Sequence, residues 1–150
     1  MNPRVRVTQF WDPRKDNGWL SNFWHAPIMY KHKEFRTSEH LYQALKCITT
    51  PEFYERIRTT HSPKDAKELA HELSYSQELE VKVANMRLVI RLKFDQHPGL
   101  QEQLINTVGT IAEISPTDLL WGTGHGGTTP GVNLMGLLLM ELRAELQHKK

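Results

Sequence analysis

The chain has 150 residues, of which 39% are hydrophobic and 24% are charged, so its composition is that of one ordered globular domain rather than a disordered segment. Its formal net charge of +2 is too small to indicate a dedicated nucleic-acid-binding protein. Its single cysteine, Cys47, excludes an intramolecular disulfide and a cysteine-rich zinc cluster.

The N-terminal part of the chain predicts strands and loops. Residues 4–10 alternate polar and apolar side chains, which is the period of a half-buried strand. Residues 12–18 are turn formers and predict a loop that leads into the aromatic-rich segment 19–24. Two stretches separated by a polar break, residues 26–30 and 34–36, predict the strands of a hairpin.

The middle of the chain predicts helices. Thr37 or Ser38 is a suitable N-cap for a helix over residues 38–47. Glu39 then lies in the first turn, where the helix dipole favours a negative charge. Further helices are predicted at residues 52–59, 61–72 and 77–96. Apolar residues recur every three or four positions in the last of these, which predicts the spine of the core: Leu79, Val83, Met86, Ile90 and Phe94.

The C-terminal part predicts two helices around a strand and a long loop. Pro98 and Gly99 end the long helix, and a helix over 100–108 and a short strand over 110–114 follow. Residues 117–131 form a loop rich in glycine and threonine, and residues 133–147 predict a last helix. Its predicted buried side consists of Leu134, Leu137, Leu138, Met140 and Leu142. No repeat or linker suggests a second domain, so residues 1–150 are predicted to be one domain.

The sequence gives little support for a metal site or for a glycine-rich loop that binds phosphate. The eight histidines are scattered and no His-Glu-x-x-His spacing occurs, so no metal site is predicted. The glycines of residues 122–127 lack the neighbours of a Walker loop. Their backbone amides could approach an anion, or the glycines could simply permit a tight path into the last helix. Cys47, at the end of an apolar helix, is expected to be a buried, inert thiol.

Two carboxylates are the better candidates for catalysis. Glu39 lies at a helix start directly after a strand, and Asp118 lies in the glycine-rich loop near Trp121. If the fold brings these acids together, they could stabilise the positive charge that develops at an anomeric carbon and activate water. Trp19, Trp24 or Trp121 could stack on a heterocyclic base. The structural alternative is that Glu39 serves only the helix dipole and Asp118 only forms a turn.

A series of motifs carries a family resemblance. The series is Gly18-Trp19-Leu20-Ser21-Asn22-Phe23, Thr37-Ser38-Glu39-His40-Leu41-Tyr42-Gln43-Ala44-Leu45-Lys46, Ala66-Lys67, Val81-Lys82 with Met86 and Lys93-Phe94, Glu113-Ile114-Ser115, Trp121-Gly122-x-Gly124, and Gly131-x-Asn133-x-x-Gly136. In this order and over nearly the whole chain, it strongly resembles the NADAR superfamily of YbiA-like N-glycosidases.

The resemblance implies an α+β, mainly helical single domain with a small β-sheet, and a hydrolase that cleaves the C1′–N bond between ribose and a nitrogen heterocycle without a cofactor or metal. The family's substrate classes include ADP-ribose attached to guanine and early phosphorylated intermediates of riboflavin synthesis. Expected partners are therefore a small nucleotide-like substrate or ADP-ribosylated nucleic acid. The sequence leaves open which substrate is used.

The resemblance also assigns residues. Glu39 falls on the central catalytic acid, and Asp118 falls on a position to which we give a supporting role at the ribose. The positions expected to bind substrate are Gly18, Trp19, Asn22, Lys46, Trp121, Gly122 and Asn133, with Lys46 and the N-terminal arginines expected near phosphate. Many relatives have an aromatic residue, usually Trp, shortly before the Val81-Lys82 pair, where this chain has no aromatic. Trp19 or Tyr75 is therefore expected to stack on the base.

Two other functions fit the same residues. One is a non-catalytic module that binds NAD or ADP-ribose, and the other is a nucleic-acid-binding module, which the small net charge disfavours. The basic residues among the first 36 indicate either an anionic ligand nearby or ordinary solvated charges. No apolar run reaches the roughly 20 residues of a membrane span, and no secretory signal is recognisable. A cytoplasmic protein without a membrane partner is expected, and its oligomeric state is left open.

Overall fold

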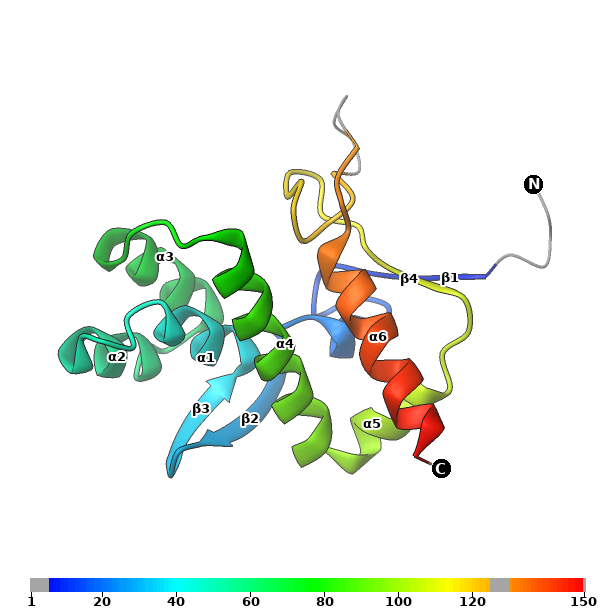
Figure 1. Ribbon diagram of the computed structural model, residues 1–150, viewed down its shortest axis with the longest axis horizontal. Helices are drawn as coiled ribbons and strands as arrows, with labels where there is room; N and C mark the ends of the chain where they lie inside the picture. The colour runs from blue at the N-terminus through cyan, green and yellow to red at the C-terminus, as the bar shows by residue number, and fades with distance from the viewer. Residues whose placement is uncertain (1–5, 125–129, 150) are drawn as a thin grey trace. The chain divides into compact units, whose positions relative to one another are not determined.

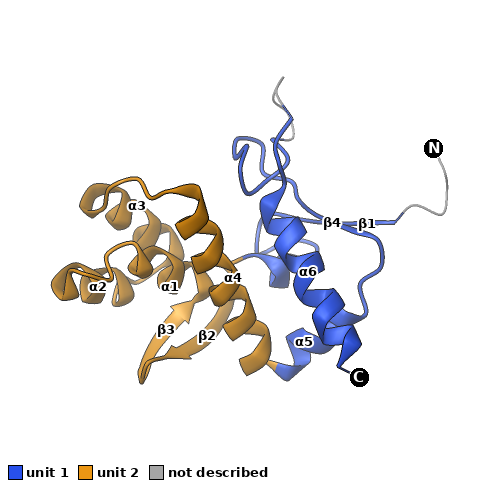
Figure 2. Ribbon diagram, in the orientation of Figure 1, with its two compact units in different colours: residues 1–21, 98–150 blue, residues 22–97 orange. Residues whose placement is uncertain are grey.

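The computed structural model describes residues 6–124 and 130–149. Within them the chain forms six α-helices, one short 3-10 helix and four strands in two two-stranded sheets (Figure 1). The predicted α+β, mainly helical class is therefore confirmed. Contacts within the chain define two compact units, Met1–Ser21 with Pro98–Lys150 (unit 1) and Asn22–His97 (unit 2), shown in Figure 2. That residues 1–150 form one domain stays a prediction.

Unit 2 begins with the predicted hairpin, which is confirmed. Strand β2 (His25–Tyr30) pairs antiparallel with β3 (Lys33–Thr37), and the facing residues Ile28 and Phe35 are both fully buried. The turn residues Lys31 and His32 both have positive φ angles, of 48° and 68°. Two consecutive positive φ angles are typical of the tight turn whose twist suits a hairpin, although Asn-Gly usually occupies it.

In unit 2, three helices pack against a fourth helix, α1. Helix α1 (Ser38–Leu45) is buried at every residue and packs against the hairpin and against α2 (Pro51–Arg58), α3 (Pro63–Leu73) and α4 (Leu79–Gln96). Both α2 and α3 start with proline, whose fixed φ suits the first turn of a helix. The Ser62 hydroxyl accepts from the Asp65 amide at 3.0 Å, as expected of an N-cap. All four predicted helices are therefore confirmed, within two residues at their ends.

Helix α4 is buried only in its later turns, which corrects the predicted spine. Met86, Ile90 and Phe94 are buried, but Leu79 is 56% exposed. The helix is fixed to the hairpin at its far end, where the Gln96 side chain forms two hydrogen bonds of 2.8 Å with the Met29 backbone. The apolar period was thus correct for the turns that contact α1 and β2, and wrong for the first turn.

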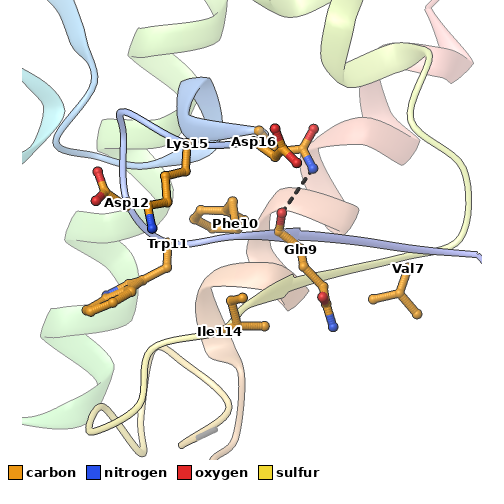
Figure 3. A pocket seen from close by; sticks show the side chains of 9 residues that line it. Val7, Gln9, Phe10, Trp11, Asp12, Lys15, Asp16 and Ile114 are labelled. Carbon is orange, nitrogen blue, oxygen red and sulfur yellow. Dashed lines mark hydrogen bonds between the residues drawn. The ribbon is translucent and has the colours of Figure 1, made fainter.

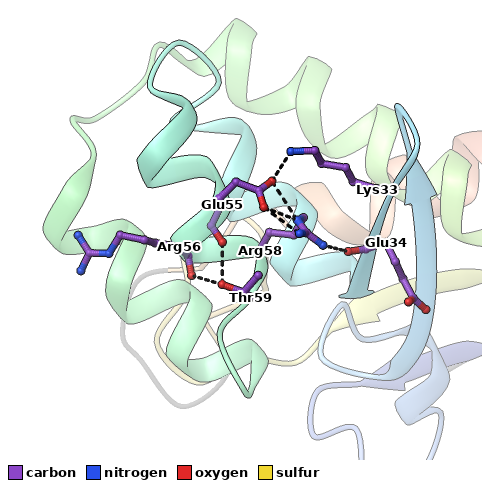
Figure 4. Close-up of polar contacts among 6 residues, drawn as sticks. All are labelled: Lys33, Glu34, Glu55, Arg56, Arg58 and Thr59. Atoms are coloured by element: carbon purple, nitrogen blue, oxygen red, sulfur yellow. Dashed lines mark hydrogen bonds and ion pairs between the residues drawn. The ribbon is translucent and has the colours of Figure 1, made fainter.

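An ion-pair network joins the hairpin to α2 (Figure 4). Lys33 and Arg58 both contact Glu55, at 2.5 and 2.8 Å, and Arg58 also donates to the Glu34 carbonyl at 3.0 Å. The hydrogen bonds from Arg58 and then Lys33 lower the pKa of Glu55 to about 2. Because these groups are partly exposed, we assign the network an orienting role rather than a large stabilisation.

Unit 1 contains a pair of parallel strands that lie far apart in the sequence. Strand β1 (Val7–Phe10) pairs with β4 (Thr110–Glu113), so that Val7 faces Thr110 and Phe10 faces Glu113. Both strands are found where predicted, although residues 1–5 lie outside the described residues, Arg4 among them. The unit also contains the 3-10 helix η1 (Gly18–Leu20), α5 (Pro98–Ile105) and α6 (Leu134–His148), with α6 against β4 and α5.

Helix α6 turns a different face to the core from the one predicted. Leu138 and Leu142 are buried as expected, but Leu137 is 49% exposed, and Leu134 and Met140 are only partly buried. The other buried positions are Met135, Gly136, Leu139 and Leu146. Because this helix has apolar residues on most sides, its sequence does not define one stripe, and the contact with β4 decides which side is covered.

Candidate functional site

The start of α1 is fixed by a buried histidine. The Thr37 hydroxyl caps the helix by accepting from the His40 amide at 3.2 Å, and it lies 2.8 Å from His40 Nδ1. His40 Nε2 donates to the Thr60 carbonyl at 3.0 Å. A carbonyl only accepts, so Nε2 carries the proton and Nδ1 accepts from Thr37. Burial lowers the pKa of His40, which keeps the ring neutral.

Glu39 is attached to this rigid helix start. Its side chain is buried, at 7% exposure for the residue, and its amide donates to the Asn22 carbonyl at 3.1 Å. Gln43 Nε2, one helical turn further on, donates to Glu39 Oε1 at 2.7 Å. The N-terminal position favours a negative charge, and the Gln43 amide fixes the direction of the carboxylate. Glu39 is therefore not turned to bulk solvent, as an exposed dipole partner would be.

Three buried acceptors close to Glu39 in the fold or the sequence have no hydrogen-bond partner among the described residues: Asn22 Oδ1, Ser38 Oγ and Gln43 Oε1. The Asn22 amide nitrogen points to the Met86 sulfur at 3.1 Å, which is a weak acceptor. Leaving a buried polar atom unsatisfied costs about 1–3 kcal/mol, and native proteins contain few of them. The surroundings of Glu39 are thus suited to a ligand that donates hydrogen bonds, such as a sugar.

Asn22, Glu39 and Lys46 are the three predicted site residues that lie in unit 2. Lys46 forms the C-cap of α1, with its Nζ 5.3 Å from the centre of the Tyr42 ring. Sequence reasoning did not single out Gln43, although its spacing of four residues from Glu39 on a predicted helix was an available signal.

Gln43→Met is expected to lower kcat by about tenfold or more, because it removes a hydrogen bond to a charged group while keeping the side chain's length and apolar part. Loss of the donor also makes protonation of the carboxylate easier, so the acid limb of the pH–rate profile should move to higher pH. Steady-state kinetics across pH would measure both effects. The matched control is Gln103→Met, at an exposed position of α5, which should leave kcat and the pH–rate profile unchanged. If the acid limb did not move in Gln43→Met, a positioning role of Gln43 would be contradicted.

The other six predicted site residues lie in unit 1, where Asp118 shapes a turn. Its Oδ1 accepts from the amides of Leu120 and Trp121, at 3.0 and 2.8 Å. Gly122 follows where a side chain has no room, since an added Cβ would lie 2.8 Å from the Ser115 Cβ. The turn-forming role of Asp118 is therefore observed, and its role at the ribose stays a prediction.

Asn133 connects the loop that contains Trp121 and Gly122 with β4 and with the start of α6. It has a φ of 58°, its amide donates to the Gly122 carbonyl at 2.9 Å, and its side chain bonds to β4 twice. Oδ1 accepts from Glu113 at 3.0 Å, and Nδ2 donates to Ile111 at 2.9 Å. Because both side-chain groups are engaged, Asn133 has a clear structural role, and contact with substrate stays a prediction.

Gly18 and Trp19 begin η1. A Cβ at Gly18 would lie only 2.1 Å from the Pro13 carbonyl oxygen, so this position requires glycine for packing reasons alone. Trp19 and Trp121 are half-buried and Trp24 is 37% exposed, whereas Tyr75 is 94% exposed. That Trp19 or Tyr75 stacks on the base stays a prediction.

Unit 1 also contains an open hollow of about 640 Å³ (Figure 3). Asn17 Nδ2 donates to the Gln9 carbonyl at 2.9 Å at its edge. The lining residues are Val7, Gln9, Phe10, Trp11, Asp12, Lys15, Asp16, Asn17 and Ile114. None of them is a predicted site residue, so the case for a catalytic site rests on the surroundings of Glu39 and not on this hollow.

The remaining sequence expectations concern the arginines, the cysteine and metals. Arg14 is paired with Asp12 at 2.9 Å, and Arg36 donates to the His61 carbonyl at 3.1 Å. Cys47 is buried, as predicted, and burial raises the pKa of its thiol. Over residues 6–124 and 130–149, no group of three or more His, Cys, Asp or Glu is arranged to hold a metal ion. His125 and the glycines after it lie outside the described residues.

A fully buried lysine lies on α4. Lys93 is 0% exposed, its Nζ is 5.4 Å from the centre of the Phe94 ring, and burial lowers its pKa from 10.5 to about 7. The unfolded chain therefore binds a proton at Lys93 between pH 7 and 10.5 that the folded chain does not. Stability should rise with pH across this window, and the full penalty should be present below pH 7.

Lys93→Met is expected to flatten that pH dependence, because methionine has a similar length and no charge to desolvate. Urea unfolding at several pH values from 6 to about 10 would measure the free energy of unfolding of both proteins. The control is Lys64→Met, whose side chain is 77% exposed. Equal pH slopes in wild type and Lys93→Met would show that Lys93 does not titrate in this window.

Comparison with known proteins identifies the family. The NADAR domain matches residues 9–147. N-glycosidase YbiA of Escherichia coli K12 is 35% identical over 148 residues, covering 96% of this chain and 91% of the relative. The chloroplastic riboflavin biosynthesis protein PYRR of Arabidopsis thaliana is 33% identical over 135 residues, covering 81% of this chain and 22% of that longer protein. The NMR structure of E. coli YbiA matches with a TM-score of 0.82 and 32% identity, over 99% of this chain and 91% of that chain.

The fold, the buried glutamate and these similarities define a hydrolase of N-glycosyl bonds. The chain belongs to the NADAR family, as its motifs predicted, and it is an N-glycosidase. Over the described residues, no helix is both long and apolar enough to cross a membrane.

Proposed function

We propose that this chain hydrolyses the N-glycosidic bond between C1′ of a ribose and a nitrogen heterocycle, with Glu39 as the catalytic carboxylate. The observation that carries the proposal is the buried Glu39 side chain, held by Gln43 at 2.7 Å beside buried acceptors that have no partner among the described residues. A carboxylate held in a site with little water stabilises a developing positive charge more than it would in solvent.

The proposed chemistry uses that charge in two ways. As the C1′–N bond breaks, its electron pair goes to the heterocycle, and Glu39 stabilises the oxocarbenium-like transition state. Water forms the new C1′–O bond and gives up a proton to the Glu39 carboxylate, which can return it to the leaving nitrogen. Asn22 Oδ1 and Gln43 Oε1 are suited to accept hydrogen bonds from the ribose hydroxyls or from this water.

We propose two substrate classes for this reaction, ADP-ribose attached to guanine and phosphorylated intermediates of riboflavin synthesis. The second is supported by the names of relatives such as the Arabidopsis riboflavin biosynthesis protein. Both classes present a ribose C1′–N bond together with phosphate groups. Asp118 is proposed to assist at the ribose, as the family resemblance suggests.

The test is incubation of the purified chain with an ADP-ribosylated guanine oligonucleotide and, separately, with the phosphorylated riboflavin intermediates. Mass spectrometry would follow the freed base and sugar, and turnover of at least one substrate is expected. Calorimetry with ADP-ribose would run in parallel. Tight ADP-ribose binding with no turnover of either substrate would overturn the proposal in favour of a binding module.

A further inference from the structure

Asn22 is joined to the start of α1 by its main chain. Its carbonyl accepts from the Glu39 amide at 3.1 Å, so the two residues are fixed to one another. Both residues are 7% exposed, and burial of this degree leaves little water to pair with their side chains. Each polar atom of the Asn22 side chain therefore needs a partner from the protein or from a ligand.

The two ends of the Asn22 side-chain amide have different surroundings. Nδ2 donates to the sulfur of Met86 on α4 at 3.1 Å, whereas Oδ1 is buried and has no hydrogen-bond partner among the described residues. A thioether sulfur has no proton and can only accept. If the amide were reversed, its oxygen would face a sulfur that cannot donate to it. Met86 thus determines which end of the amide stays available to a ligand.

Gln43 shows the same division between its nitrogen and its oxygen. Its Nε2 donates to Glu39 at 2.7 Å, and its Oε1 is buried without a partner among the described residues. Two amides from different segments therefore bond to the protein through nitrogen and keep their oxygens for a ligand. An oxygen acceptor discriminates in favour of a group that donates, because a buried acceptor left unpaired carries the full cost of its desolvation.

The Met86 contact is well suited to hold the amide in one orientation. Met86 is 2% exposed, so water does not compete for its sulfur, and α4 packs against α1. A leucine at this position would have a similar volume but could not accept a hydrogen bond. The sulfur therefore contributes a function that apolar packing alone does not supply.

We propose that Met86 is a positioning residue of the N-glycosidase reaction, whose sulfur holds the Asn22 amide so that Oδ1 accepts a hydrogen bond from a ribose hydroxyl of the substrate. This inference rests on the proposed function, since the sugar is the one attacked beside Glu39. Met86 acts through Asn22 and needs no contact of its own with the substrate. In Met86→Leu the Nδ2 group loses its acceptor, so the amide is free to turn and the oxygen is no longer held toward the hydroxyl.

The first test compares kcat/KM for an N-riboside that the wild type cleaves with kcat/KM for its 2′-deoxy and 3′-deoxy forms. Met86→Leu should lower the ratio of the riboside value to one of the deoxy values about tenfold, the effect of losing one hydrogen bond to the sugar. The ratio is compared between proteins, so the intrinsic lability of each compound cancels. The matched control is Ile90→Leu, one turn further along α4 and also 2% exposed, which should leave the ratio unchanged.

A double-mutant cycle tests whether Met86 acts through Asn22. Asn22→Ala removes the amide, so adding Met86→Leu to that variant should change kcat/KM for the riboside by no more than about twofold. A purely structural role of Met86 predicts the same loss of kcat/KM with and without the amide, and that result would overturn the inference. Thermal unfolding of each variant would measure any change in packing separately.

A binding experiment separates this inference from the proposed function. Ribose 5-phosphate and its 2-deoxy and 3-deoxy forms would be titrated by calorimetry into wild type and Met86→Leu, so that no bond is cleaved. A preference of the wild type for ribose 5-phosphate that Met86→Leu loses supports the positioning role, even if no N-glycoside is hydrolysed. Turnover with an unchanged ratio in Met86→Leu overturns the positioning role and leaves the N-glycosidase standing. If no compound is turned over, equal binding of the three sugars by the wild type overturns it as well.

Discussion

Glu39→Gln is expected to lower kcat by about 10²–10⁴-fold, the usual contribution of a positioned acid or base. Glutamine keeps the shape of the side chain but removes the charge that stabilises the transition state and the basic oxygen that takes a proton from water. The residue is buried on a capped helix, and its contact with Gln43 can persist as an amide–amide hydrogen bond, so the fold should be retained. Mass-spectrometric assays would measure the loss of kcat, and thermal unfolding would measure whether the fold is retained.

Two results would distinguish catalysis from binding in that variant. KM should change much less than kcat, because the charge acts mainly in the transition state. A matched control is Glu102→Gln, on the exposed side of α5, which should behave like wild type in both measurements. Equal kcat in wild type and Glu39→Gln would remove the carboxylate from the mechanism.

Gly136→Ala is expected to destabilise the protein by about 3 kcal/mol, the upper part of the usual range for overpacking. An added Cβ would lie 2.0 Å from the Ile111 carbonyl oxygen and 2.5 Å from Asn133 Nδ2. Neither atom can move easily, since one belongs to the β4 backbone and the other is bonded to it at 2.9 Å. For a chain of this size, the melting temperature should fall by about 6–12 °C.

Gly99→Ala provides the control for that measurement. Gly99 also lies in a helix, but an added Cβ there has no neighbour within 4 Å. Its replacement should leave stability unchanged or raise it by up to about 1 kcal/mol, through helix propensity. If both variants melted at the same temperature, the close packing of α6 on β4 at Gly136 would be contradicted.

The candidate site shows how far sequence patterns reach. The N-cap, the helix after it and the position of Glu39 at its start were predicted from residues 37–47 alone, because capping and dipole effects act within one turn. The resemblance added Asn22 and Lys46, both of which lie in the same unit as Glu39.

The sequence by itself determined the existence and approximate bounds of every main helix and strand, the family, and the residue at the centre of the proposed chemistry. Periodicity, proline and capping signals act between near neighbours and can be recognised without a fold. Only the tertiary structure decided that β1 pairs in parallel with β4, that α6 turns Leu137 outward, and that His40 of α1 binds the Thr60 carbonyl. These features depend on contacts between segments distant in the chain or on side-chain geometry, which no local pattern specifies.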